Sequence, residues 1–137
     1  MSVERRPAVI GAERVDFVAV PVQDLARADR FYGETLGLQR NPNSDDRWVE
    51  YETGNVTLAL VQPELIGREF QPLPYAAIAI RVADVEAARA KLEGAGISFS
   101  HDVYDSGVCT MSAFTDSEGN GLLIHRRYAP YADGSSS

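Results

Sequence analysis

The stretch from Val18 to Leu38, VAVPVQDLARADRFYGETLGL, decides the fold of this chain. Valines at every second position at its start predict a strand, and Asp24 then stands where a side chain caps the first turn of a helix. The apolar residues that follow recur at intervals of three and four, which places them on one helix face: Leu25, Ala28, Tyr32 and Leu36. Gly37 ends this helix and leads into another strand.

The same plan returns in the second half of the chain. Residues 78–97 read IAIRVADVEAARAKLEGAGI, again a strand, an aspartate and a helix with an apolar face. Four residues have counterparts in the first stretch: Val82 matches Val22, Asp84 matches Asp24, Val85 matches Leu25, and Ala88 matches Ala28. An internal repeat of this kind predicts a chain built from two similar units.

Alternation and turn residues outside the repeat supply the remaining strands. We predict strands over 14–21, 38–41, 47–53 and 56–62 in the first half, and over 75–82, 97–101, 108–114 and 122–126 in the second. The fold is therefore expected to be α+β, with two βαβββ modules over 14–62 and 75–127 of a single domain, 1–137. The proline-rich segment 63–74 connects them, and residues 132–137 are expected to form a frayed tail.

The composition excludes several classes of function. The net charge is −7 and the basic residues are scattered, whereas nucleic-acid binding requires clustered positive charge. Cys109 is the only cysteine, so no intramolecular disulfide can form, as is usual in a reducing compartment. The sequence also contains no apolar run of membrane-spanning length and no apolar secretory segment after Met1. We expect a cytoplasmic protein that binds neither nucleic acid nor membranes.

Two motifs connect the chain with a known family. Residues 20–38, VPVQDLARADRFYGETLGL, resemble the opening of the vicinal oxygen chelate superfamily, which includes glyoxalase I, extradiol dioxygenases, fosfomycin-resistance enzymes and bleomycin-binding proteins. The turn 116–120, DSEGN, resembles the superfamily's DPDGN turn, with Ser117 in place of proline. The resemblance covers about residues 14–127. It implies a curved mixed sheet around a central cavity and a homodimer, but no single activity, because the fold hosts several unrelated chemistries.

In metal-dependent members of this superfamily, one residue on each of four strands binds a divalent cation inside the cavity. Counting from Asp24, from Asp84 and from the closing turn, the resemblance places these positions at four residues: Phe17, Ala59, Ala77 and Leu123. Divalent cations require nitrogen, oxygen or sulfur ligands, which these side chains lack. We therefore predict no metal and no cofactor, and an apolar cavity that suits a hydrophobic or aromatic ligand.

Strand alternation adds further residues to the predicted ligand site. Matching the two halves places Trp48 and Glu50 opposite Ser112 and Phe114. His101 precedes a loop that can cover the pocket, although a lone loop histidine is also common as polar surface.

Two residues are candidates for chemistry, and each has a second interpretation. His125 lies two residues beyond Leu123 and can act as a general acid or base, since histidine has an ordinary pKa of ~6.5; alternatively it is a rim residue. Glu50, if it faces inward, can receive a cationic ligand group beside the indole of Trp48. If it faces outward, Glu50 belongs to a solvated edge and Trp48 lies in a subunit interface.

Three functions are compatible with this sequence. The first is a metal-independent protein that binds a small hydrophobic or aromatic metabolite such as an antibiotic. The second is a lyase, isomerase or oxygenase of the glyoxalase or dioxygenase type. Such an enzyme would use either a displaced metal site formed by His125, Glu50 and His101 or metal-free acid–base catalysis by His125 and Glu50. The third is a structural or regulatory module whose cavity is filled by its own side chains.

Overall fold

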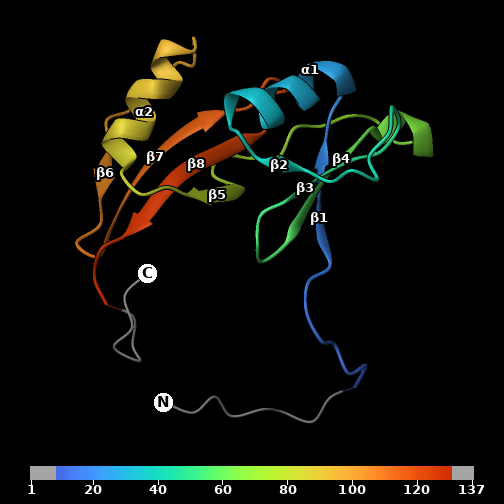
Figure 1. Ribbon diagram of the computed structural model, residues 1–137, viewed down its shortest axis with the longest axis horizontal. Coiled ribbons are helices and arrows are strands. Elements are labelled where there is room, and N and C mark those ends of the chain that lie inside the picture. The colour runs from blue at the N-terminus through green and yellow to red at the C-terminus, as the bar shows by residue number, and fades with distance from the viewer. Residues whose placement is uncertain (1–8, 131–137) are drawn as a thin grey trace.

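The computed structural model describes residues 9–130 as two modules with the same order of elements (Figure 1). The first module contains β1 (Phe17–Pro21), α1 (Leu25–Arg30), a π-helical turn η1 (Phe31–Thr35), β2 (Gln39–Arg40), β3 (Val49–Glu52) and β4 (Thr57–Val61). The second contains β5 (Ile78–Arg81), α2 (Val85–Gly94), β6 (Tyr104–Asp105), β7 (Cys109–Thr115) and β8 (Gly121–Arg127). The tail expected at 132–137 lies outside the described residues.

Each module forms one four-stranded mixed sheet. The strand orders are β1-β4-β3-β2 and β5-β8-β7-β6, and in both sheets the first strand runs parallel to its neighbour while the other pairs are antiparallel. Both helices lie along the upper side of the molecule in Figure 1, with the strands below. The predicted α+β fold of two βαβββ modules is confirmed.

The two predicted helix caps are also confirmed. Asp24 accepts a hydrogen bond from the Arg27 amide at 3.0 Å, and Asp84 accepts one from the Ala87 amide at the same distance. Each carboxylate satisfies an amide that has no partner within the helix. The two equivalent aspartates therefore start the two helices in the same way.

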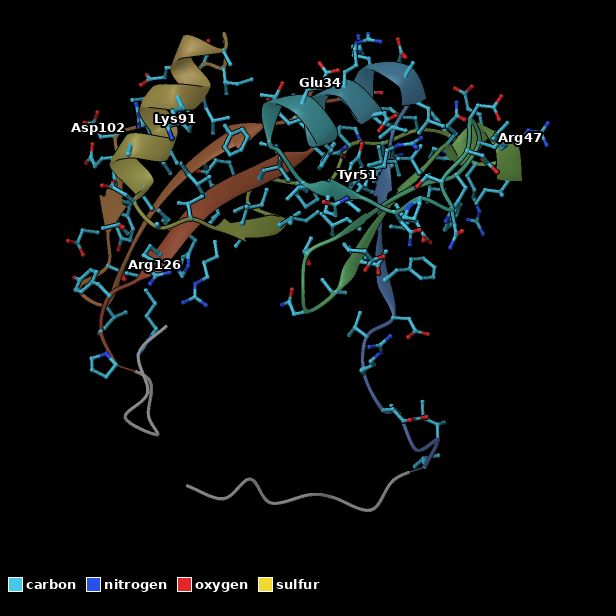
Figure 2. All side chains as sticks on the ribbon, in the orientation of Figure 1. Glu34, Arg47, Tyr51, Lys91, Asp102 and Arg126 are labelled. Carbon is cyan, nitrogen blue, oxygen red and sulfur yellow. The ribbon has the colours of Figure 1, made fainter. Side chains whose placement is uncertain are left out.

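One apolar cluster lies between the helices and the sheets. It includes Val20, Tyr51 and Leu60 from the first module and Leu122 and Ile124 from the second. Figure 2 shows Tyr51 in the layer between α1 and the strands of the first module. Since the cluster is continuous across the repeat, the modules share one core.

The predicted strand at 97–101 is wrong. This segment follows α2 and forms no strand, and the edge strand of the second sheet is β6 instead. Phe99 packs against Phe114 with ring centroids 5.4 Å apart, and the Arg89 guanidinium lies 4.7 Å from the Phe99 ring centroid. These contacts hold the segment against the helix and the core, so it does not pair with β7.

The connector also differs from its expected irregular course. It begins with a short 3₁₀ helix, η2 (Pro63–Ile66), which has proline in its first turn and ends at Gly67 with a φ of 72°. Proline suits the first turn because it lacks the amide proton that would be unsatisfied there.

No helix within residues 9–130 combines the length and the apolar character that a membrane crossing requires.

The closing turn 116–120 joins the two modules through buried polar groups. Asp116 accepts the Tyr32 hydroxyl at 2.6 Å. Glu118 accepts the amides of Gln23 and Asp24 at 2.5 and 2.7 Å. Asn120 donates to the Pro21 carbonyl at 2.8 Å. The family-like turn therefore holds the second module against the start of α1.

Candidate ligand site on the open faces

Each sheet has one face covered by its helix and one open face. In the first sheet, Val18, Val20, Leu58 and Leu60 contact the core, so the alternate residues lie on the open face. Register places Phe17 beside Thr57 and Glu50 beside Ala59. Four residues of the predicted site therefore belong to this face: Phe17, Trp48, Glu50 and Ala59.

Two aromatic rings and a carboxylate meet on the open face of the first sheet. The Phe17 and Trp48 ring centroids are 5.9 Å apart and the rings are nearly perpendicular, at 85°. The Trp48 indole donates its Nε1 hydrogen to Glu50 Oε2 at 2.7 Å. Phe17 and Trp48 remain 49% and 37% exposed, respectively. These rings therefore present an apolar surface to solvent beside a negative charge.

The loop before β3 fixes the position of Trp48. Asp45 Oδ1 accepts the amides of Arg47 and Trp48 at 2.8 and 2.9 Å. These two bonds lower the pKa of the Asp45 carboxyl, because hydrogen bonds to a carboxylate favour its ionised form. The tryptophan thus enters the strand from an ordered turn.

The open face of the second sheet contains a pocket of about 490 Å³. Ala113 and Leu123 lie opposite each other in β7 and β8, and Met111 lies two residues before Ala113. Tyr75 and Ala76, in the turn between the connector and β5, contribute further wall, together with the segment His101–Tyr104. Most of this lining is hydrocarbon or aromatic, which is typical of sites for small organic ligands.

The structure brings only part of the predicted site into this pocket. His101, Ser112 and Leu123 are among its lining residues. Ala77 and His125 also belong to the open side of the second sheet, because Ala77 lies two residues before Ala79 and His125 lies opposite Arg81 and Met111. They are not among the lining residues of the pocket.

The inward orientation predicted for the Ser112 and Phe114 side chains is wrong. Phe114 is 5% exposed and belongs to the core. Ser112 touches the pocket, but its hydroxyl accepts a hydrogen bond from Arg89 of α2 at 3.1 Å, on the helix side. Matching the halves placed β7 one residue out of register, and such a slip exchanges the two faces of a strand.

Four lining residues were not identified from the sequence: Tyr75, Ala76, Met111 and Ala113. Asp102, Val103 and Tyr104 were expected only as part of a loop that can cover the pocket. The sequence does contain a signal for Met111 and Ala113. A large apolar side chain such as Phe114 belongs in the core, so the residues that alternate with it in the strand, Met111 and Ala113, are expected on the open face. Tyr75 lies in a turn before β5, although the sequence predicted a strand from residue 75, and Tyr104 lies in the edge strand β6. Their positions follow from the tertiary packing alone.

The four positions implied for a metal do not fit one. Phe17 and Ala59 share the open face of the first sheet, and Ala77 and Leu123 that of the second, but none has a donor atom. Among residues 9–130, no group of three or more histidine, cysteine, aspartate or glutamate side chains is arranged to hold a metal. The displaced set of His125, Glu50 and His101 is not such a group either: Glu50 lies in β3, His125 in β8, and His101 in the segment between α2 and β6.

The protein-family comparison matches residues 14–124 to the Glyoxalase/Bleomycin resistance protein/Dioxygenase superfamily. The chain belongs to this superfamily. A Mycolicibacterium smegmatis protein described only as uncharacterized is 30% identical over 112 residues, which are 81% of this chain and 91% of the relative. The motifs in the sequence and the fold described above thus agree with the family assignment.

Solved structures of other proteins have the same fold. An antibiotic-binding protein from a Streptomyces species aligns with a TM-score of 0.71 and 23% identity, covering 86% of this chain and 98% of that one. A lactoylglutathione lyase from Agrobacterium tumefaciens aligns with a TM-score of 0.68 and 18% identity, covering 83% and 93%. At these identities the alignments show the shared architecture, on which both binding and catalysis occur.

Proposed function

We propose that this superfamily member is a metal-independent binding protein for a hydrophobic or aromatic small molecule, such as an antibiotic. The observation that carries the proposal is the pocket on the second sheet. Leu123, at one of the positions where metal-dependent relatives need a ligand, forms part of its apolar wall. Burial of a ligand against Met111, Ala113 and Leu123 would remove apolar surface from water, which is the main driving force for binding of this kind.

The antibiotic-binding protein with a similar structure supports this proposal, because it shares the fold. At 23% identity, the comparison shows the fold alone. The alternative of acid–base catalysis by His125 and Glu50 fits the geometry less well. His125 lies in β8, opposite Arg81, whereas Glu50 lies in β3 of the other sheet.

We also propose a homodimer, in which a second copy covers apolar side chains such as the exposed Tyr75 and Tyr104.

A thermal-shift experiment with a pocket-filling variant tests the binding function. Naphthol, menadione and a set of aromatic antibiotics are added to protein in buffer that contains EDTA. A ligand at ten times its Kd adds about 1.4 kcal/mol to the free energy of unfolding, which raises the melting temperature by several degrees. Ala113→Phe should abolish this shift, because the added ring occupies the pocket.

The matched control is Thr115→Phe, which adds the same ring to the same strand face two residues away from Ala113. It should preserve the shift. Three results would contradict the proposal: no ligand stabilises the wild type, Ala113→Phe responds as the wild type does, or stabilisation requires a metal in place of EDTA.

A further inference from the structure

The open face of the first sheet has a combination of groups that the apolar pocket lacks. Phe17 and Trp48 form a corner of two nearly perpendicular rings, and the Glu50 carboxylate is fixed at the indole edge. Asn41 Nδ2 also approaches Glu50 Oε1, at 3.4 Å. Neutral donors therefore orient the carboxylate without cancelling its charge.

No lysine or arginine within residues 9–130 forms an ion pair with Glu50 or with Glu52, its neighbour on this face. Glu52 accepts hydrogen bonds from Thr57 and Asn41 at 2.9 and 3.1 Å, both from neutral groups. Cations from neighbouring segments have other partners: Arg14 pairs with Asp16, and Arg40 with Asp29. The aromatic corner thus lies beside two carboxylates that form no ion pair with any lysine or arginine of the described part of the chain.

From this geometry we infer that Phe17, Trp48 and Glu50 form a second subsite, for an organic cation such as a protonated or quaternary amine. The methyl or methylene groups around the positive nitrogen would contact the ring faces, where the aromatic quadrupole attracts positive charge. The carboxylate would neutralise that charge. This inference goes beyond the proposed function, because it assigns a ligand class to the open face of the first sheet, whereas the apolar pocket lies on the second sheet.

The test uses choline and its neutral isostere, in which a tert-butyl group replaces the trimethylammonium group. Trp48 is the only tryptophan in the sequence, so the wild-type protein gives a single indole N–H signal in a ¹H–¹⁵N NMR spectrum. Titration at constant ionic strength follows this signal. We expect choline to bind about tenfold more tightly than the isostere, as cation–π attraction and one carboxylate together allow.

Two variants localise the effect. Glu50→Gln keeps an oxygen acceptor for the indole but removes the charge, and should reduce choline affinity to that of the isostere. Glu52→Gln removes the same charge from the same face, but Glu52 does not bond to the indole. This variant should weaken choline binding by no more than about threefold. Phe17→Ala removes one wall of the corner and should also weaken choline binding.

Equal affinity for choline and the isostere would overturn the inference, and so would equal losses in the Glu50→Gln and Glu52→Gln variants. An indole signal that moves with protein concentration but not with choline would overturn it in favour of a subunit contact. These failures are distinguishable from failure of the proposed function. Neutral aromatic ligands would still stabilise the wild type but not Ala113→Phe if only the cation subsite were wrong.

Discussion

Glu118 combines full burial with four hydrogen bonds from the other module. Its side chain is 0% exposed, and it accepts the Gln23 and Asp24 amides together with two guanidinium nitrogens of Arg27. A buried carboxylate is stable only when its lone pairs are satisfied in this way. The Arg27 side chain is 49% exposed, so solvent screens that partner more than it screens the two amides.

Glu118→Gln should lower the free energy of unfolding by about 3 kcal/mol, because the amide group turns one acceptor into a donor and removes the charge. Chemical denaturation with urea measures this change. Glu69→Gln, an exposed site in the connector, serves as control and should stay within about 0.5 kcal/mol of the wild type. Equal effects in the two variants would show that the closing turn does not stabilise the module contact.

The ionisation of Tyr32 makes the stability of the fold depend on pH in the alkaline range. Its hydroxyl is buried and donates to Asp116. Burial, and secondarily the Asp116 charge, raise the pKa of Tyr32 far above its ordinary value of 10.0. The folded state therefore retains a proton that the unfolded chain loses above about pH 10. The resulting stabilisation is present below that pH and is lost as the pH rises.

Tyr32→Phe should reduce the decline of unfolding free energy above about pH 10 by up to ~1.4 kcal/mol per pH unit. At neutral pH the same variant should cost about 1 kcal/mol, since Asp116 loses a donor. Urea unfolding at several alkaline pH values measures both effects. Tyr104→Phe, at a tyrosine that is 61% exposed, should leave the slope unchanged, and identical slopes in both variants would contradict the prediction.

At the scale of elements, the start of β8 and the end of the connector approach each other so closely that only glycine fits. A Cβ on Gly121 would overlap the Pro74 carbonyl oxygen and would lie 2.6 Å from the Tyr75 Cα. Backbone atoms cannot yield as a flexible side chain would. This contact also sets the position of Tyr75 and Ala76, which line the pocket.

Gly121→Ala should therefore destabilise the protein by about 3 kcal/mol and weaken ligand binding by displacing the connector. Circular dichroism melting and the thermal-shift assay measure the two effects. Gly94→Ala is the matched control, because a Cβ there meets no atom within 4 Å and the residue ends α2. That variant should gain up to about 1 kcal/mol. Full tolerance of Gly121→Ala would refute the packing argument.

At the scale of the whole molecule, the open faces leave large apolar side chains in contact with water. Tyr75 is 68% exposed, Tyr104 61% and Phe17 49%. Exposed apolar groups gathered on functional faces are characteristic of ligand or subunit contacts. The proposed homodimer would cover part of this surface while the ligand covers the rest.

Sedimentation equilibrium at several protein concentrations tests the proposed dimer. We expect a species of twice the chain mass of 15.0 kDa, with dissociation only on dilution, because mass action governs association. A mass that stays at that of one chain across the whole concentration range would contradict the proposal and leave both open faces to ligand or solvent.

The local sequence determined the elements that depend on neighbouring residues. Asp24 and Asp84 start their helices as predicted, because a helix cap involves residues three positions apart. The repeat and the family-like motifs likewise predicted two βαβββ modules. The side chains of Phe17, Ala59, Ala77 and Leu123 have no donor atom for a metal, and this follows from the residue types alone.

Only the tertiary structure decided which residues meet across modules and strands. Phe114 turned toward the core because the register of β7 against β8 is fixed by pairing between distant residues. The segment 97–101 packs against α2 and the core and forms no strand, because Phe99 contacts Arg89 and Phe114. Tyr75 lies in the pocket wall because the backbone of the segment before β5 packs against Gly121. Glu118 accepts hydrogen bonds from residues almost a hundred positions earlier in the chain. Such contacts depend on three-dimensional packing, which no local pattern in the sequence encodes.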